Sequence, residues 1–335
     1  MKYFNQVLEF FSKKLLNFFY LILKIIRKLY LLFLPLKRIK FQIDLNEAEK
    51  ANKLISDKLN SISPCMIARF GATELNVINN HIGINSKEKS ILKFITNKCP
   101  QWWWNKNILR NFNIWSGFFP INNLNLINKY CDLFFKDIKE IDILGVWGNS
   151  LNFHHKNISN INRVKVEYLE PFFSKNPWTK ALEGKKVLVI HPFKDSIEQQ
   201  YKKKDLLFSN NLLPNFELIT LKAVQSVANE TTHYKDWFEA LEYMKNEMNK
   251  VNFDIALIGC GAYGLHLAAH AKKIGKKGFH IGGVLQIIFG IIGTRYENPN
   301  QSGGVYLKLF NKNWIRPSKD ETPKDAHLVE KNTYW

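Results

Sequence analysis

Short apolar runs alternate with longer mixed stretches along most of this chain of 335 residues. The pattern is clearest at residues 185–191 (KKVLVIH), 216–221 (FELITL) and 254–259 (DIALIG), each followed by a stretch with helical character. Runs of this length are typical of buried strands, and the stretches between them are typical of the helices that connect parallel strands. The alternation therefore favours an α/β fold over an all-β or all-α fold.

The expected elements divide the chain into an N-terminal helix and two α/β halves. In the second half we expect strands at 185–191, 216–221, 254–259 and 278–281, with helices at 196–208, 234–250 and 264–272. This order predicts a Rossmann-like, doubly wound sheet. In the less regular first half we expect a helix at 45–59, a strand, turn and helix at 66–79, and a strand at 141–147. The predicted boundaries are 1–40 for the helix, then 41–183, 184–295 and a tail at 296–335 within one catalytic domain.

The first 40 residues are both basic and very apolar. They contain nine Lys and Arg residues against one acid, Glu9, and so carry +8 of the chain's net charge of +19. Their longest charge-free runs, 15–23 and 29–36, are shorter than the roughly 20 residues that cross a bilayer. We expect a helix that Pro35 ends.

The polar residues of that helix gather on one side. At about 100° per residue they fall within about 140° of arc; they are Lys2, Gln6, Glu9, Lys14, Asn17, Lys24, Arg27 and Lys28. This pattern predicts a helix lying on an anionic membrane surface. We therefore expect the protein to be cytoplasmic and peripheral, on the inner face of the cytoplasmic membrane. The alternative is an amphipathic helix that packs on this protein's own core or on a partner.

A glycine-rich turn follows the third strand of the second half. Residues 259–264 (GCGAYG) match G-x-G-x-x-G and open a helix, so Gly261, Tyr263 and Gly264 are candidate phosphate-binding residues. Nicotinamide dinucleotides also need an Asp or Glu about 20 residues further on, and none occurs at 255–296. The turn is therefore interpreted either as a phosphate or sugar site or as close packing of strand and helix.

Three further segments place polar groups where strands of the sheet end. Residues 69–74 (RFGATE) bring Arg69, flexible Gly71 and Glu74 to the end of the first strand, where open α/β sheets bind ligands. Residues 191–196 (HPFKDS) bring polar groups to the end of the strand at 185–191, in the second half of the chain. The last strand, at 278–281, is followed by several glycines and by Arg295. The candidate phosphate-binding residues here are His191, Lys194, Ser196, Gly282, Gly283 and Arg295. Structural alternatives exist for each segment, such as an N-cap at Ser196 or a surface arginine at position 69.

Two other features have more ordinary interpretations. The Trp-rich stretch favours packing over a carbohydrate-stacking platform, because aromatic residues serve mainly in packing; its tryptophans are Trp102, Trp103, Trp104 and Trp115. His266 and His270 have a spacing that can chelate a metal, but their helix lacks the intervening Glu and an obvious third ligand, which favours a structural role.

The segments IARFGATEL and LIGCGAYGLHLAAHAKKIGKKGFHIGG resemble the bacterial GT-D-type glycosyltransferases, at motif level, in a layout covering most of residues 60–290. The tail, with NWIRP at 313–317 and Tyr334 and Trp335 near its end, is similar to that of proteins from polysaccharide loci. The resemblance implies transfer of a hexose from a nucleotide-sugar donor, of the UDP-sugar type, to a lipid-linked or glycan acceptor during cell-surface glycan synthesis.

In that family the R-F-G turn precedes an Asp-x-Glu pair associated with a divalent metal and the donor diphosphate. Here Glu74 matches the Glu, whereas Ala72 stands at the Asp position. The resemblance thus leaves Glu74 as the catalytic base or as the only protein ligand of Mn²⁺ or Mg²⁺, with Arg69 as the other catalytic candidate. In the alternative without a metal ion, Arg69, Lys194 or Arg295 supplies the positive charge that the metal ion would otherwise provide.

Two rival function classes stay open on the sequence. A nucleotide-dependent oxidoreductase or epimerase accounts for the glycine-rich turn, although the ribose-binding acid is missing. A non-catalytic membrane or polysaccharide scaffold accounts for the basic helix and for Ala72. Nucleic acid is not an expected partner, because the charge is concentrated in an apolar helix and no recognition motif is present.

Overall fold

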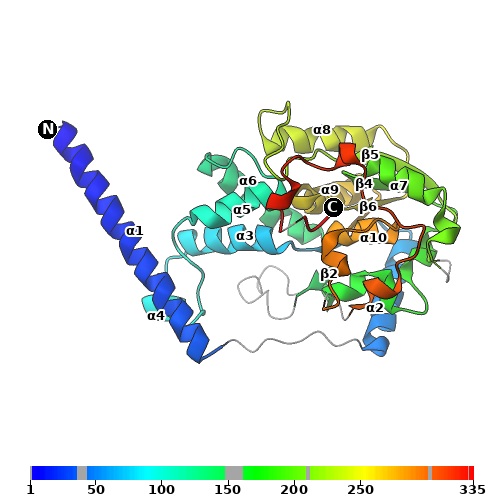
Figure 1. Cartoon of the computed structure of the whole chain (residues 1–335), viewed down its shortest axis with the longest axis horizontal. Coiled ribbons are helices and arrows are strands. Elements are labelled where there is room, and N and C mark those ends of the chain that lie inside the picture. Colours follow the sequence, from blue (N-terminus) through cyan, green and yellow to red (C-terminus); the bar gives the residue numbers. More distant parts are fainter. Residues whose placement is uncertain (1, 36–43, 148–160, 209–211, 301–303, 331) are drawn as a thin grey trace. The chain divides into compact units, whose positions relative to one another are not determined.

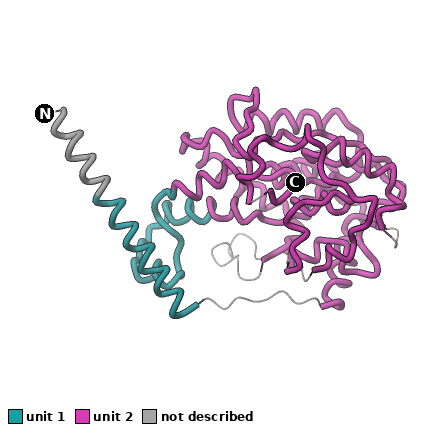
Figure 2. The backbone as a smooth tube through the Cα atoms, viewed as in Figure 1, with its two compact units in different colours: residues 1–40, 78–105 teal, residues 41–77, 106–335 magenta. Residues whose placement is uncertain are grey.

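The computed structural model describes residues 2–35, 44–147, 161–208, 212–300, 304–330 and 332–335, and side chains from Leu15 onward. The chain forms two compact units, residues 1–40 with 78–105 and residues 41–77 with 106–335 (Figure 2). The second unit contains the sheet and the last segment of the chain. The helix α3 (Ala72–Asn85) begins in the second unit and ends in the first.

The second unit is built on one sheet of seven parallel strands with helices around it (Figure 1). The strand order is β3-β2-β1-β7-β6-β4-β5. The strands are β1 (Cys65–Arg69), β2 (Ile143–Val146), β3 (Asn162–Lys165), β4 (Lys186–His191), β5 (Glu217–Lys222), β6 (Ile255–Ile258) and β7 (Lys277–His280). An all-parallel sheet covered by helices confirms the α/β prediction and is compatible with a Rossmann-like fold.

Strand β1 joins the two predicted halves into this one sheet. Its Ile67 lies opposite Ile143 of β2 on one side and opposite Phe279 of β7 on the other. All three side chains are buried, because apolar groups at the centre of a covered sheet are removed from water. The core therefore runs continuously from the first half of the chain to the second.

The helices follow the predicted order closely where the apolar pattern was clear. They are α2 (Leu45–Asn60), α5 (Lys106–Ser116), α6 (Leu124–Asp137), α7 (Lys194–Tyr201), α8 (Trp237–Asn249), α9 (Gly264–Lys273) and the short α10 (Leu285–Ile288). The predicted helix at 196–208 is shorter and earlier than expected, and continues as a 3₁₀ turn at Lys204–Leu206. The apolar pattern of the sequence predicts neither the strand β3 nor the helices α5 and α6.

The strand order reverses beside β4. After β4 the chain continues to β5 on one side, whereas after β6 it continues to β7 on the opposite side. Connections that leave in opposite directions open a crevice at the carboxyl ends of the two strands, which is where such sheets bind ligands. Here β4 ends at His191, and the glycine-rich turn follows β6 directly.

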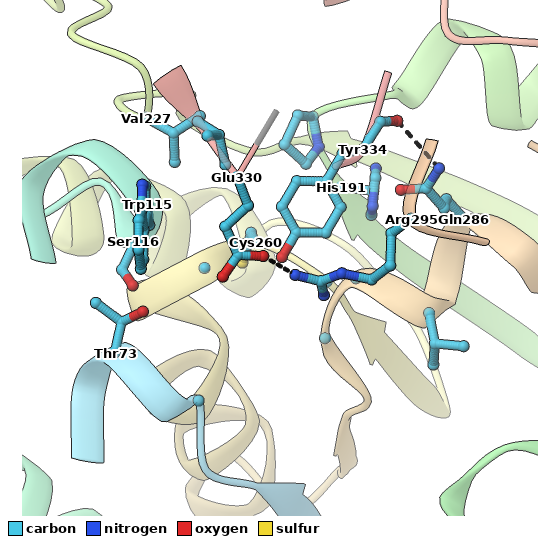
Figure 3. Close-up of a pocket in the computed structure, with 18 of the residues that line it drawn as sticks. Thr73, Trp115, Ser116, His191, Val227, Cys260, Gln286, Arg295, Glu330 and Tyr334 are labelled. Atoms are coloured by element: carbon cyan, nitrogen blue, oxygen red, sulfur yellow. Dashed lines mark hydrogen bonds and ion pairs between the residues drawn. The ribbon is translucent and has the colours of Figure 1, made fainter. Parts of the chain in front are cut away.

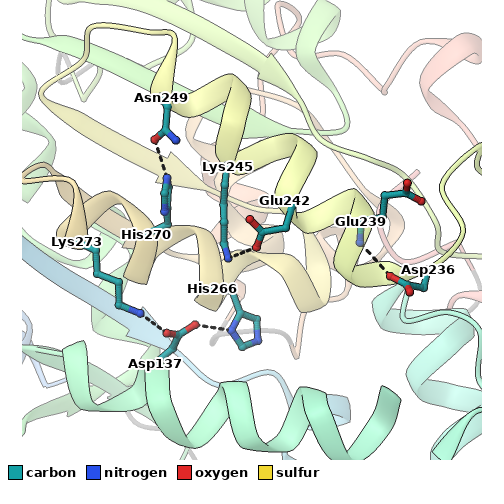
Figure 4. A network of polar contacts seen from close by, with 9 residues as sticks. All are labelled: Asp137, Asp236, Glu239, Glu242, Lys245, Asn249, His266, His270 and Lys273. Atoms are coloured by element: carbon teal, nitrogen blue, oxygen red, sulfur yellow. Dashed lines mark hydrogen bonds and ion pairs between the residues drawn. The ribbon is translucent and has the colours of Figure 1, made fainter. Parts of the chain in front are cut away.

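His266 and His270 have separate partners (Figure 4). His266 Nδ1 lies 2.8 Å from Asp137 Oδ2, and Lys273 Nζ lies 2.5 Å from the other oxygen of that buried carboxylate. His270 instead meets Asn249. Although burial acts to raise the pKa of Asp137, His266 and Lys273 hold it below its ordinary value. The His266 contact joins α6 to α9, as expected for the structural interpretation.

The first unit contains α1 (Lys2–Phe33) and the helix α4 (Ile91–Ile95). Tyr20 stacks on Trp103 with ring centres 4.0 Å apart, and the Arg27 guanidinium lies 4.6 Å from the centre of the Phe94 ring. Lys24 lies 5.9 Å from the centre of the Trp103 ring. This side of α1 therefore packs on the protein's own residues 94–103, as the structural interpretations of the helix and of the tryptophans expect.

The opposite side of α1 is apolar and exposed. Its exposed side chains include Phe18 at 60%, Ile25 at 50% and Leu29 at 49%. Lys2, Gln6, Glu9 and Lys14 of the predicted basic face lie among the residues whose side chains are outside the described part. None of the described helices is both long and apolar enough to cross a bilayer.

Candidate functional site

A cavity of about 540 Å³ opens at the carboxyl edge of the sheet (Figure 3). It is lined by the segments that follow β1, β2, β4, β5, β6 and β7, by Glu170 beyond β3, and by residues from the last part of the chain. The sequence-predicted residues that line it are Arg69, Gly71, Glu74, His191, Gly261, Tyr263, Gly282, Gly283 and Arg295. Parallel strands end at a common edge, so one cavity collects residues that are more than 200 positions apart in the chain.

Arg69 is the last residue of β1 and lines the cavity. Its Nη2 donates to the carbonyl oxygen of Phe70 (3.2 Å), and its guanidinium lies 5.1 Å from the centre of the Trp147 ring. The buried Nε has no hydrogen-bond partner in the described part of the chain. A guanidinium with an uncommitted donor in a cavity is suited to bind an oxyanion.

Glu74 lies in the first turn of α3, and its carboxyl group folds back over Gly71. Burial raises the pKa of this carboxyl group, while its own backbone N–H, Arg69 and Ser116 act in the opposite direction. A carboxyl group with a raised pKa is better matched to proton transfer near neutral pH than an exposed one. Glu74 thus lines the cavity with a carboxyl group whose pKa is raised.

Internal packing accounts for two glycines of the GCGAYG turn. Gly261 has φ +56°, and a Cβ there would lie 2.8 Å from the carbonyl oxygen of Ser116. Gly264 begins α9, and a Cβ there would overlap the His280 ring. Both positions need glycine without any ligand. The turn nevertheless lines the cavity with Gly259, Cys260, Gly261 and Tyr263.

His191 ends β4 and is only 4% exposed. Its Nδ1 accepts the backbone N–H of Phe193 at 3.0 Å, which leaves the ring proton on Nε2. Burial lowers the pKa of His191 to about 3, so the ring is neutral at physiological pH. Since Nε2 has no hydrogen-bond partner among the described residues, His191 offers one neutral N–H donor to the cavity.

The last part of the chain forms one wall of the cavity. Glu330 makes an ion pair with Arg295, and Tyr334 lies over the same guanidinium at 5.3 Å (Figure 3). The carbonyl oxygen of Tyr334 accepts a hydrogen bond from Gln286. The sequence gives this tail a family likeness but no place in the site. No local motif connects residues 330–335 with cavity residues as distant in sequence as Arg69.

Lys194, Ser196 and Gly264 are the sequence-predicted residues that do not line the cavity. Lys194 pairs with Glu198 at 2.9 Å on its own helix. The N-terminus of α7 is occupied by the buried Glu321 carboxylate, which accepts the N–H groups of Asp195 (2.8 Å) and Ser196 (3.2 Å) as well as the Ser196 hydroxyl. An internal carboxylate therefore lies where the sequence predicted a bound phosphate.

Glu170 is a cavity residue that the sequence analysis missed. It is 8% exposed, and its Oε2 accepts a 2.7 Å hydrogen bond from the hydroxyl of Tyr306. Burial raises the pKa of Glu170 to about 8, although the bond from Tyr306 opposes this. The position gives no sequence signal, because Glu170 lies between two 3₁₀ helices, Val166–Leu169 and Pro171–Phe173, with no motif around it.

The described residues do not fit a dedicated divalent-cation site. They contain no group of three or more His, Cys, Asp or Glu side chains arranged to hold a metal. Ala72 supplies no side-chain oxygen, and Glu74 is faced by Arg69. Mg²⁺ and Mn²⁺ prefer several oxygen ligands gathered around one point, which these residues do not supply.

Comparison with known protein families, curated proteins and solved structures found no match to this chain.

Changing Glu170 to Gln should alter the pH dependence of stability. The ordinary pKa of a glutamate is 4.5, so between about pH 5 and 8 the folded protein keeps a proton that the unfolded chain has lost. Glu170 should therefore reduce stability as pH rises, by up to about 1.4 kcal/mol per pH unit in that window. Gln accepts the same hydrogen bond without titrating. We expect the melting temperature of Glu170→Gln, relative to wild type, to be higher at pH 8 than at pH 5.5; an equal difference at both pH values would contradict this assignment.

Proposed function

We propose that this protein is a glycosyltransferase that moves a sugar from a nucleotide-sugar donor to a lipid-linked or glycan acceptor. The observation that carries the proposal is the gathering of Arg69, Arg295 and His191 in one cavity beside the glycine-rich turn. The cavity lies beside the reversal of strand order, where nucleotide ligands bind in sheets of this kind. The likeness to the GT-D-type family agrees with this proposal.

The main chemical demand of the reaction is to stabilise a leaving nucleoside diphosphate. Arg69 and Arg295 supply positive charge, and the neutral His191 supplies an N–H donor. Such fixed donors are effective in a partly buried site, because they do not have to reorganise as charge develops. The diphosphate would compete with Glu330 for Arg295, since both are anions.

Glu74 is the proposed base for the acceptor hydroxyl. Its raised pKa suits proton removal from a hydroxyl group in the transition state, while Arg69 limits how far the pKa rises. Water is partly excluded by the residues of the tail that line the cavity, Val329, Glu330, Tyr334 and Trp335. These roles require no bound metal ion.

We also propose that α1 holds the protein on the inner face of an anionic membrane. The side of α1 away from Tyr20 and Arg27 exposes apolar side chains over residues 15–33, which is typical of a helix lying in the lipid headgroup region. The net charge of +8 in residues 1–40 favours anionic lipid over a second, equally basic copy of the segment. A membrane-bound enzyme meets a lipid-linked acceptor at high local concentration.

Calorimetric titration of UDP, GDP and CMP into the full chain, in buffer with EDTA, tests the transferase proposal. We expect one nucleotide to bind with micromolar affinity, and Arg295→Gln to weaken it by about tenfold or more, since a hydrogen bond to a charged group is lost. Lys194→Gln is the matched control and should leave the affinity unchanged, because Lys194 lies outside the cavity. Failure of all three nucleotides to bind wild type would favour a non-catalytic scaffold.

Flotation with lipid vesicles tests the membrane proposal. The triple variant Phe18→Gln/Ile25→Gln/Leu29→Gln removes exposed apolar side chains while keeping residues that favour helix. We expect it to lose most binding to vesicles containing anionic phosphatidylglycerol, because apolar burial drives insertion. Lys28→Gln is the control for charge and should weaken binding to anionic vesicles more than to neutral ones. Wild type that stays unbound to both kinds of vesicle would contradict the proposal.

A further inference from the structure

The part of the cavity wall that follows β2 and β3, here called the Glu170 end, differs in chemistry from Arg295 and His191, and Arg69 lies near it. Glu170, Tyr306 and Trp147 all line the cavity there. Glu170 and Tyr306 are 8% and 1% exposed, whereas Trp147 is 38% exposed. This end therefore combines two buried polar groups with an accessible aromatic ring.

Glu170 has one oxygen committed and the other available. Oε2 accepts from the Tyr306 hydroxyl, whereas Oε1 has no hydrogen-bond partner in the described part of the chain. With a pKa of about 8 the carboxyl group carries its proton near neutral pH, and the bond from Tyr306 to Oε2 leaves Oε1 as the hydroxyl oxygen. The group can then both donate to and accept from a hydroxyl of a ligand.

Trp147 supplies an apolar surface beside this carboxyl group. Its indole Nε1 donates to the carbonyl oxygen of Phe70 at 3.4 Å, and the Arg69 guanidinium lies 5.1 Å from the ring centre. These contacts orient the ring, yet part of it stays accessible. A sugar ring has C–H faces that pack on such a surface and hydroxyl groups that bind a neighbouring polar group.

The two carboxyl groups near this end disfavour a phosphate, although Arg69 acts on both of them in the opposite direction. Glu167 lies near Glu170 and raises its pKa further, and burial raises the pKa of Glu167 as well. A phosphate here would face the Glu170 carboxyl group, with Glu167 close behind it, and so would bind better beside Arg295 and His191. The ligand that fits the Glu170 end is neutral and rich in hydroxyl groups.

We infer that Glu170, Tyr306 and Trp147 form the subsite for the transferred sugar ring, with Oε1 of Glu170 hydrogen-bonded to a sugar hydroxyl. The inference rests on the proposed function and adds to it the orientation of the donor. The nucleotide lies beside the glycine-rich turn after β6, and the sugar lies toward β3. Four strand spacings of about 4.8 Å separate β6 from β3, and the segment carrying Glu170 reaches inward from β3 to the cavity.

The test compares each nucleoside diphosphate with its sugar conjugate by calorimetry: UDP with UDP-glucose and UDP-N-acetylglucosamine, and GDP with GDP-mannose. Glu170→Ala and Trp147→Leu should each weaken the preferred nucleotide-sugar by about tenfold, while the free diphosphate stays within about twofold of wild type. Glu170→Gln should retain most of the sugar-dependent affinity, because an amide also donates and accepts. Glu167→Gln is the matched carboxyl control and should have no effect, since Glu167 does not line the cavity.

The outcomes separate this inference from the function on which it rests. If wild type binds a nucleotide-sugar and neither Glu170→Ala nor Trp147→Leu changes its affinity, the subsite is wrong and the transferase proposal stands. If these substitutions weaken the free diphosphate equally, their effect is not specific to sugar and the subsite is also wrong. If wild type binds neither member of any pair, both proposals fail. Circular dichroism of the Glu170→Ala protein, compared with that of Glu170→Gln, shows whether lost binding reflects lost folding.

Discussion

The pairing of β1 with both β2 and β7 is the interaction on which the rest of the structure depends. It joins three strands from the first half of the chain to four from the second in one parallel sheet. Because parallel strands all end at the same edge, this pairing brings Arg69 to the same cavity as His191 and the glycine-rich turn. Two separate sheets would leave the candidate residues of the two halves without a common site.

The second determinant of the site is the last part of the chain, which lies across the carboxyl edge. Glu321 neutralises the N-terminus of α7, and Glu330 neutralises Arg295. Glu321 is fully buried and lies outside the cavity lining, whereas Glu330 and Arg295 line the cavity. An internal carboxylate, Glu321, therefore occupies the predicted anion site at the N-terminus of α7. At Arg295 the internal carboxylate is Glu330, and a bound anion would compete with it.

The sequence predicted the fold where apolar runs were long and buried, as in β4 and β6, because burial on both faces leaves a continuous apolar pattern. It missed β3, whose residues are mostly exposed and polar at the edge of the sheet. At the site, strand ends with motifs were predicted, including Arg69 and Glu74, and these line the cavity. Glu170, Tyr306 and Trp147 could not be predicted as a group, because only the tertiary fold brings them together. The burial of Lys24 and Arg27 of α1 against aromatic rings likewise depends on residues 94–103, distant in sequence.

A crystal structure of the full chain with the nucleoside diphosphate that it binds tests the central claim most directly. We expect the phosphates in the cavity at the carboxyl edge, within hydrogen-bond distance of Arg69, Arg295 and His191 Nε2, with Glu330 no longer paired to Arg295. We also expect the terminal phosphate to point toward Glu170. A diphosphate bound elsewhere on the chain, with the Arg295–Glu330 pair intact, would contradict the account.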